Sequence, residues 1–155
     1  MMEKMAKTPS ASPLAQLETA LNIYFGEKAP SLPANWKEFI VKIAPWITLV
    51  ILLLSLPAVL ALLGIGALLT PVSYMGGPTF GMTYTISLVF LAITIILEAL
   101  ALPGLFKKTR QGWNFVFYST LVSIIGNIIY FNIGGIILGT IIPLYFLFQI
   151  RSYYK

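Results

Sequence analysis

The feature that most constrains this chain is a long stretch without any charged side chain. No Asp, Glu, Lys or Arg occurs between Lys42 and Glu98, and most of the intervening residues are apolar. A membrane-crossing helix needs about 20 consecutive apolar residues, so this stretch is long enough for two crossings. Only 10% of the whole chain is charged, whereas soluble domains carry about 25%. The sequence therefore predicts an integral membrane protein.

Missing residue types exclude several kinds of site. The chain has no cysteine, no histidine and no aspartate. Disulfides, thiol chemistry, haem ligation by histidine and ordinary zinc sites are excluded. General acid–base catalysis would have to use Glu98, Asn127, tyrosine or serine, which is difficult. We therefore expect no enzymatic activity, no metal and no cofactor.

Four segments are apolar enough to cross a bilayer. They are residues 46–69, 83–102, 113–130 and 134–150. Asn132, Gly134 and Gly135 favour a turn between the third and the fourth, and prolines inside the spans are tolerated in membrane helices. The predicted fold is all-α: a four-helix transmembrane bundle over residues 46–155.

The cations occur only on alternate connections. They precede the first span, lie between the second and third, and follow the fourth: Lys37, Lys42, Lys107, Lys108, Arg110, Arg151 and Lys155. By the positive-inside rule, both termini are cytoplasmic. The net charge of +5 then indicates contact with anionic headgroups rather than with nucleic acid. The expected location is the cytoplasmic membrane.

The N-terminal residues have a separate organisation. Residues 1–12 are polar and rich in Ser, Pro and Ala, and we expect them to be disordered. Residues 13–25 predict a helix that begins at Pro13 with Ser12 as its N-cap. One face of this helix carries apolar side chains: Leu14, Leu17, Leu21 and Tyr24.

A second amphipathic helix is expected over residues 36–44. Its apolar side chains fall on one face, which is typical of a helix lying in the membrane interface. Pro45 is expected to break this helix and turn the chain into the first span. The cytoplasmic segment 13–45 either seats the protein on the inner leaflet, or its first helix docks a partner or a sister subunit.

Polar side chains form stripes on the second and third spans. The second carries Thr83, Ser87, Thr94 and Glu98, within ~60° of one another at ~100° per residue. The third carries Ser119, Ser123, Gly126, Asn127 and Tyr130. Small residues occur on the other two spans: Gly64 and Gly66 on the first, and the GxxxG pair Gly135 and Gly139 on the fourth. Such residues let membrane helices pack closely and form interhelical hydrogen bonds. The alternative is that the second and third spans line a polar path or a headgroup-binding groove.

Glu98 is the acidic residue to explain. It lies near the end of the second span, ~6 Å from the expected cytoplasmic edge. There it would anchor the helix end, paired with a cation of the basic loop formed by Lys107, Lys108 and Arg110. The alternative is a proton- or cation-coupled site.

Two stretches carry a resemblance to a known class. "LPGLFKKTRQGWNFVFYSTL" joins the second and third spans, and "LYFLFQIRSYYK" closes the chain. With these stretches, the chain from Pro45 to Lys155 resembles small, uncharacterised four-helix integral membrane proteins of bacteria. The resemblance implies a bacterial cytoplasmic membrane and carries over neither an activity nor functional residues.

Three functions remain open. The first is a structural or accessory protein that assembles with itself or with a larger membrane complex through its glycine and hydroxyl faces. The second is a small oligomeric transporter or channel, with Glu98 near the cytoplasmic end of the path. The third, which the missing residue types disfavour, is a lipid-active enzyme.

Overall fold

The computed structural model describes residues 12–155, which form helices joined by short turns. The N-terminal helix α1 (Pro13–Leu21) continues into π-helical turns at Asn22–Lys28. A long run follows, made of α2 (Ala34–Ala61), π-helical turns at Leu62–Gly66, α3 (Ala67–Ser73) and a 3-10 turn at Tyr74–Gly76. Then come α4 (Pro78–Phe106) and α5 (Arg110–Ile129). The last run comprises α6 (Ile133–Ile136), π-helical turns at Ile137–Ile141, α7 (Ile142–Gln149) and a 3-10 turn at Arg151–Tyr153.

Three of the described helical runs are long and apolar enough to cross a membrane. They are Ala34–Gly76, Pro78–Phe106 and Arg110–Ile129. The fourth expected span, 134–150, corresponds to the run Ile133–Gln149, which is apolar but shorter. The all-α fold is therefore confirmed, with three helices that meet the length and composition of a membrane span.

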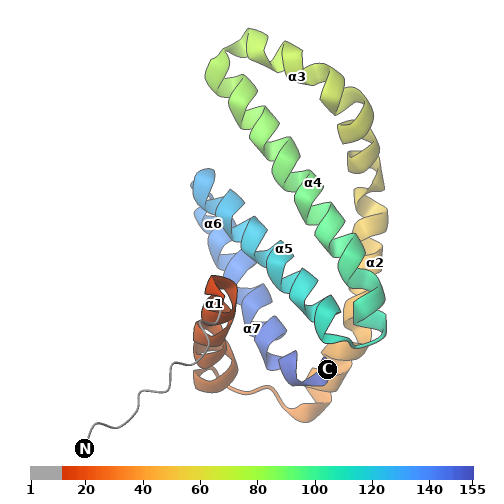
Figure 1. Cartoon of the computed structure of the whole chain (residues 1–155), viewed down its shortest axis with the longest axis vertical. Coiled ribbons are helices and arrows are strands. Elements are labelled where there is room, and N and C mark those ends of the chain that lie inside the picture. Colours follow the sequence, from red (N-terminus) through yellow and green to blue (C-terminus); the bar gives the residue numbers. More distant parts are fainter. Residues whose placement is uncertain (1–11) are drawn as a thin grey trace, which may run out of the picture.

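The helices are arranged around α4 and α5 (Figure 1). These two make the most extensive contact of any pair of described elements, and α4 also packs against α2. The run α2–α3 bows away from the middle of α4, and the α3–α4 hairpin rises beyond the turn between α5 and α6. The π-helical turns after α1 lie against α7.

Helix starts follow local chemistry. The Ser12 hydroxyl accepts a hydrogen bond from the Ala15 N–H at 3.3 Å, and Pro13 opens α1, so the predicted cap is confirmed. The Asn132 side chain caps α6 in the same way, through the Gly135 N–H at 3.0 Å. The chain reverses into α4 at Gly77, whose φ of 110° lies in the region that favours glycine.

Two sequence predictions about boundaries are wrong. α2 runs through Pro45 without interruption, so no separate helix ends there. α4 continues to Phe106 through the segment expected to be a turn, so Glu98 lies about two turns before the helix end. The expectation of disorder concerned residues 1–12, of which 1–11 lie outside the described residues.

One packed core lies where α2, α4, α5, α7 and the C-terminal segment meet. Its buried apolar members are Val41, Ala101, Leu105, Trp113, Phe117, Leu144, Leu147, Phe148, Ile150 and Tyr154. Large apolar side chains along the rest of α2, α3 and α4 are mostly exposed. That distribution suits helices whose solvent is lipid, because a helix that is apolar all round needs a nonpolar environment.

Candidate functional site

α4 and α5 approach each other closely where two glycines face each other. A Cβ atom on Gly112 would lie 2.4 Å from the carbonyl carbon of Gly104, and one on Gly104 would lie 2.5 Å from the Cα of Gly112. The Thr109 hydroxyl spans the contact: it accepts from the Gly112 N–H and donates to the Gly104 carbonyl, both at 3.3 Å. This crossing fixes the first turn of α5, which carries Arg110 and Trp113.

Trp113 is the buried centre of the site. Its side chain is fully buried, and its Nε1–H donates to the Leu147 carbonyl at 2.9 Å. Its ring stacks on Phe117 and meets Phe148 edge-on, each at a centroid distance of 5.4 Å. Trp113 therefore joins α5 to α7.

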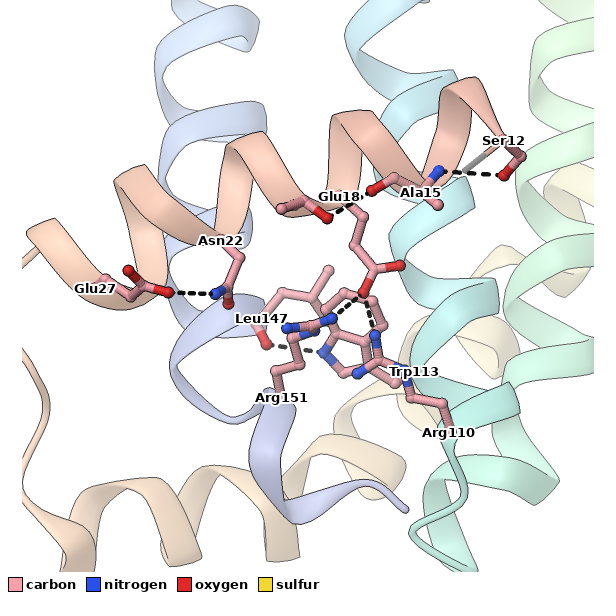
Figure 2. A network of polar contacts seen from close by, with 10 residues as sticks. Ser12, Ala15, Glu18, Asn22, Glu27, Arg110, Trp113, Leu147 and Arg151 are labelled. Atoms are coloured by element: carbon pink, nitrogen blue, oxygen red, sulfur yellow. Dashed lines mark hydrogen bonds and ion pairs between the residues drawn. The ribbon is translucent and has the colours of Figure 1, made fainter. Parts of the chain in front are cut away.

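Glu18 of α1 joins two arginines above this ring (Figure 2). Its Oε1 atom accepts hydrogen bonds from Nη2 of both Arg110 and Arg151. The guanidinium of Arg110 lies 4.3 Å from the centre of the Trp113 ring, and that of Arg151 lies 5.8 Å from it. The carboxylate offsets the repulsion between the two cations, and the ring face adds a favourable cation–π contact. We call these four residues the Glu18 cluster.

Gln149 provides a second attachment of the N-terminal segment. Its Nε2 donates to the Phe25 carbonyl at 2.8 Å, and its Oε1 accepts from the Leu32 N–H at 3.1 Å. The Tyr145 hydroxyl donates to the Pro30 carbonyl at 2.6 Å. Buried backbone groups of an irregular segment need such partners, so α7 fixes the path of the chain between α1 and α2.

The apolar face of α1 is divided between this attachment and the surface. Leu21 and Phe25 pack against the core. Leu14, Leu17 and Tyr24 remain 48%, 40% and 62% exposed. The N-terminal segment therefore docks on its own chain with one edge of the predicted face, and the rest of that face stays uncovered.

The C-terminal residue closes the site through the backbone. The Lys155 N–H donates to the Lys108 carbonyl at 3.1 Å, and the Arg110 N–H donates to the Lys155 carbonyl at 2.9 Å. The turn between α4 and α5 is thus paired with the end of the chain. Lys108 adopts a left-handed conformation there, with φ of 54°.

The three cations of the basic loop lie in different surroundings. Lys107 and Lys108 are exposed, whereas Arg110 turns inward to Glu18. The ion pairs among residues 12–155 are those of Glu18 with Arg110 and Arg151. The expected ion pair between Glu98 and this loop is therefore wrong.

The predicted polar stripes of α4 and α5 face each other. The hydroxyls of Ser87 and Tyr130 lie 2.6 Å apart, and Tyr130 also lies 3.4 Å from the Thr83 carbonyl. Nearer the core, the Ser119 side chain lies near the Glu98 carboxyl.

The remaining stripe residues, Ser123 and Thr94, make only contacts within their own helix or ordinary packing contacts. The Ser123 hydroxyl donates to the Ser119 carbonyl of its own helix at 3.1 Å, and Thr94 is half-buried on α4.

Asn127 and the predicted GxxxG pair lie together between α5 and the last helical run. Asn127 Nδ2 donates to the Gly135 carbonyl at 3.2 Å. A Cβ on Gly135 would lie 2.4 Å from Asn127 Oδ1, and one on Gly139 would lie 3.4 Å from Nδ2. The small residues of this run thus pack against the chain's own α5.

The glycines of the first span behave differently from each other. The Gly66 carbonyl accepts a hydrogen bond from the Tyr84 hydroxyl at 3.4 Å, which ties the long first run to α4. A Cβ on Gly64 would meet nothing within 4 Å. Gly64 is therefore on an open surface.

The residues that build the site were not among the predicted ones, apart from Arg110. Glu18 and Arg110 are 92 positions apart in the sequence. The hydrogen-bond partners of Gln149 are more than 110 positions from it. No local periodicity pairs residues over such distances. The one available signal was the polarity of Gln149 and Trp113 within apolar segments, since buried polar groups require partners.

The site has no features of a metal centre. Within residues 12–155, no group of three or more His, Cys, Asp or Glu side chains lies close together.

Comparison with known protein families, with curated proteins and with solved structures finds no match for the chain.

Proposed function

We propose that this chain is a non-enzymatic integral membrane protein of the structural or accessory type, which assembles with itself or with a larger membrane complex. The observation that carries the proposal is the use of its intramembrane polar side chains. Ser87 of α4 bonds Tyr130 at the end of α5, Ser123 bonds its own helix, and Asn127 bonds the next helical run. Polar groups consumed in this way stabilise helix packing and do not line a path.

The α3–α4 hairpin, with the end of α2 and the π-helical turns that lead into it, is the proposed assembly surface. It extends beyond the α5–α6 turn (Figure 1), and few other described residues pack against it. Leu60, Leu68 and Met75 are 68%, 77% and 86% exposed, and Gly64 offers open space beside them. This surface replaces most of the glycine and hydroxyl faces expected from the sequence, because those faces are occupied within the chain.

The proposed location is the cytoplasmic membrane of a prokaryote, with both termini inside. The alternation of cations along the chain supports this orientation. Anionic headgroups and a membrane complex or a second copy are the proposed partners.

Native mass spectrometry of the protein extracted with its lipids tests the assembly. We expect a dimer or higher oligomer, or a stoichiometric second protein; a bare monomer would contradict the proposal. Gly64→Leu should weaken the assembly, because it adds bulk to the open surface without touching the monomer's own contacts. The matched control is Leu138→Phe, which adds bulk to an exposed position outside the hairpin.

A small oligomeric transporter is the second candidate, and Glu98 favours it. The residue is half-buried within α4, and no described cation pairs with it. An ionisable group inside a membrane helix often serves transport. In proteoliposomes, a transporter would lose proton- or cation-coupled flux on Glu98→Gln and keep it on Glu38→Gln, an exposed residue of α2. The accessory function predicts no flux in either protein.

A further inference from the structure

An apolar groove opens between α2, α5 and α7. Its volume is about 410 Å³, within the range of about 300–1,000 Å³ typical of small-molecule sites. Ile40, Ala44, Val116, Phe146 and Leu147 are among its lining residues, and the buried Trp113 also lines it. Except for two threonines and one tyrosine, every side chain that lines it is apolar. A hydrocarbon chain is the kind of group that such a groove accepts.

A polar pocket of about 380 Å³ lies next to this groove, and Tyr154 lines both. Its lining includes three cations, Lys37, Arg110 and Arg151, and one carboxylate, Glu27. Glu18 neutralises part of the arginine charge from its place in the Glu18 cluster (Figure 2). Three positive groups against two negative ones leave the pocket with an excess of one positive charge.

Two polar atoms at this junction have no hydrogen-bond partner in the described chain. They are the hydroxyl of Tyr154 and Nε of Arg151. Tyr154 is only 3% exposed, and burying an unpaired hydroxyl is costly. Both atoms are able to donate to an anionic oxygen, which would remove that cost.

On two elements, the lining changes from apolar to cationic within a few residues. On α2, Lys37, Ile40 and Ala44 share one helix face, so the cation is followed along the helix by groove residues. On the C-terminal side, Ile150 lines the groove and Arg151 lines the polar pocket. An occupant that matches both walls is an amphiphile with an anionic end. Lys37 makes no ion pair with a described residue, so its charge is available for that end.

We propose that these two spaces form one binding site for an anionic phospholipid. An acyl chain lies in the groove, and the phosphodiester, with its single negative charge, meets Lys37, Arg151 and the Tyr154 hydroxyl. The proposal goes beyond the accessory function, since it holds whether or not the protein assembles. A bound lipid would join α2 to α7, and would thereby link the long first run to the last.

The test is native mass spectrometry of the delipidated full-length protein in detergent, titrated with dioleoyl phosphatidylglycerol or dioleoyl phosphatidylcholine. We expect one phosphatidylglycerol to bind more tightly than phosphatidylcholine. Lys37→Gln should weaken phosphatidylglycerol binding about fivefold, as for the loss of one cation beside an anionic headgroup. The matched control is Lys42→Gln, an exposed residue of α2 that lines neither space.

Two further variants separate the parts of the site. Tyr154→Phe should weaken phosphatidylglycerol binding while keeping the packing of the ring. Ala44→Phe should reduce binding of both lipids, because it fills the groove. Lys37→Gln and Tyr154→Phe keep the proposal falsifiable if Ala44→Phe does not fold.

Three results would overturn the proposal. Equal affinity for the two lipids would indicate an apolar groove without headgroup recognition, as expected if the membrane helix of another protein occupies it. Unchanged phosphatidylglycerol binding by Lys37→Gln would place the headgroup elsewhere. Displacement of phosphatidylglycerol by glycerol phosphate alone would assign the site to a soluble phosphate. None of these results bears on the oligomer test, so the two proposals fail independently.

Discussion

At the scale of single residues, Glu18 holds two cations together. Its carboxylate is 19% exposed and bonds two guanidinium groups that both lie above Trp113. Removing the negative charge leaves two cations close together with no compensation. The repulsion would act on α1, on the start of α5 and on the C-terminal segment at once.

We therefore expect Glu18→Gln to lower the free energy of unfolding by about 1–3 kcal/mol, the range for losing charge-assisted hydrogen bonds. Because α1 carries the carboxylate, protease cleavage after α1 should also become faster. Thermal unfolding in detergent and limited proteolysis measure the two effects. Glu38→Gln removes an exposed carboxylate and serves as control; equal behaviour of the two variants would contradict the role of Glu18.

Trp113 should be the least replaceable of the three tryptophans. Trp113→Phe removes the Nε1–H donor from the buried Leu147 carbonyl and leaves a void in the core. We expect a loss of about 1–3 kcal/mol in unfolding free energy. Trp36 and Trp46 are 60% and 58% exposed, so the same change there should have little effect on the thermal midpoint. Similar midpoints for all three variants would refute this assignment.

Tyr154 gives the site a pH dependence. Burial raises the pKa of its hydroxyl from 10.0 to about 12. The folded state therefore favours the neutral form: this contribution to stability is present below about pH 10 and is lost as the pH rises through about 12.

Tyr154→Phe isolates that effect in lipid-free protein. At neutral pH the variant should be as stable as the wild type or more so, because it lacks a buried hydroxyl without a partner. Above about pH 10, the wild type should lose stability relative to the variant. Chemical unfolding at several pH values measures the gap, and tyrosinate absorbance should lose one late-titrating group in Tyr154→Phe. A gap that stays constant with pH would contradict the raised pKa.

At the scale of helices, the crossing of α4 and α5 depends on two glycines. A methyl group on Gly112 would lie within 2.7 Å of three backbone atoms of Gly104 and Leu105, so the helices would have to separate. Backbone cannot move aside as the end of a flexible side chain can. The contact also sets the position of Arg110 and Trp113, so its loss would reach the Glu18 cluster.

Gly112→Ala should therefore lower unfolding free energy by ~3 kcal/mol, the upper end of the overpacking range, or prevent folding. Gly64→Ala is the matched control, because a Cβ there meets open space. It should leave stability unchanged or raise it by up to ~1 kcal/mol through helix propensity. Circular dichroism melts in detergent compare the two. A mild effect of Gly112→Ala would show that the helices do not cross this closely.

The helices were predictable to the extent that their causes are local. Apolar run length located all four helical runs, and Ser12 with Pro13 located the start of α1. The prediction that Pro45 ends a helix was wrong, because membrane helices tolerate proline and α2 continues through it. The Glu18 cluster and the Gly104–Gly112 crossing were not predictable. The Glu18 cluster joins residues 92 and 133 positions apart, and one sequence contains no periodic signal for that. The Gly104–Gly112 contact spans the α4–α5 turn, and it was missed because α4 continues past residue 102 to Phe106.

At the scale of the whole molecule, the two ends differ in how they are held. One end joins the N-terminal segment, the α4–α5 turn and the C-terminus through the core, the Glu18 cluster and Gln149. The other end is the exposed apolar α3–α4 hairpin (Figure 1). A cationic end and an apolar end are what the proposed orientation in the bilayer requires. What decides that orientation is whether the short run Ile133–Gln149 crosses.

Single-cysteine labelling resolves the crossing, since the chain has no native cysteine. The short run is at most about 25 Å long by helix rise, against a hydrocarbon core of about 30 Å. Local thinning of the bilayer and snorkelling of Arg151 would make up the difference.

We expect Lys107→Cys and Ser152→Cys to react only with a cytoplasmic reagent. Met75→Cys and Phe131→Cys, at positions 86% and 88% exposed, should react only from the opposite side. Labelling of positions 131 and 152 from the same side would mean that the run does not cross.

In that case the C-terminus would lie on the side of the membrane opposite to Lys107. The backbone hydrogen bonds of Lys155 with Lys108 and Arg110 hold the two together, so those bonds would have to break.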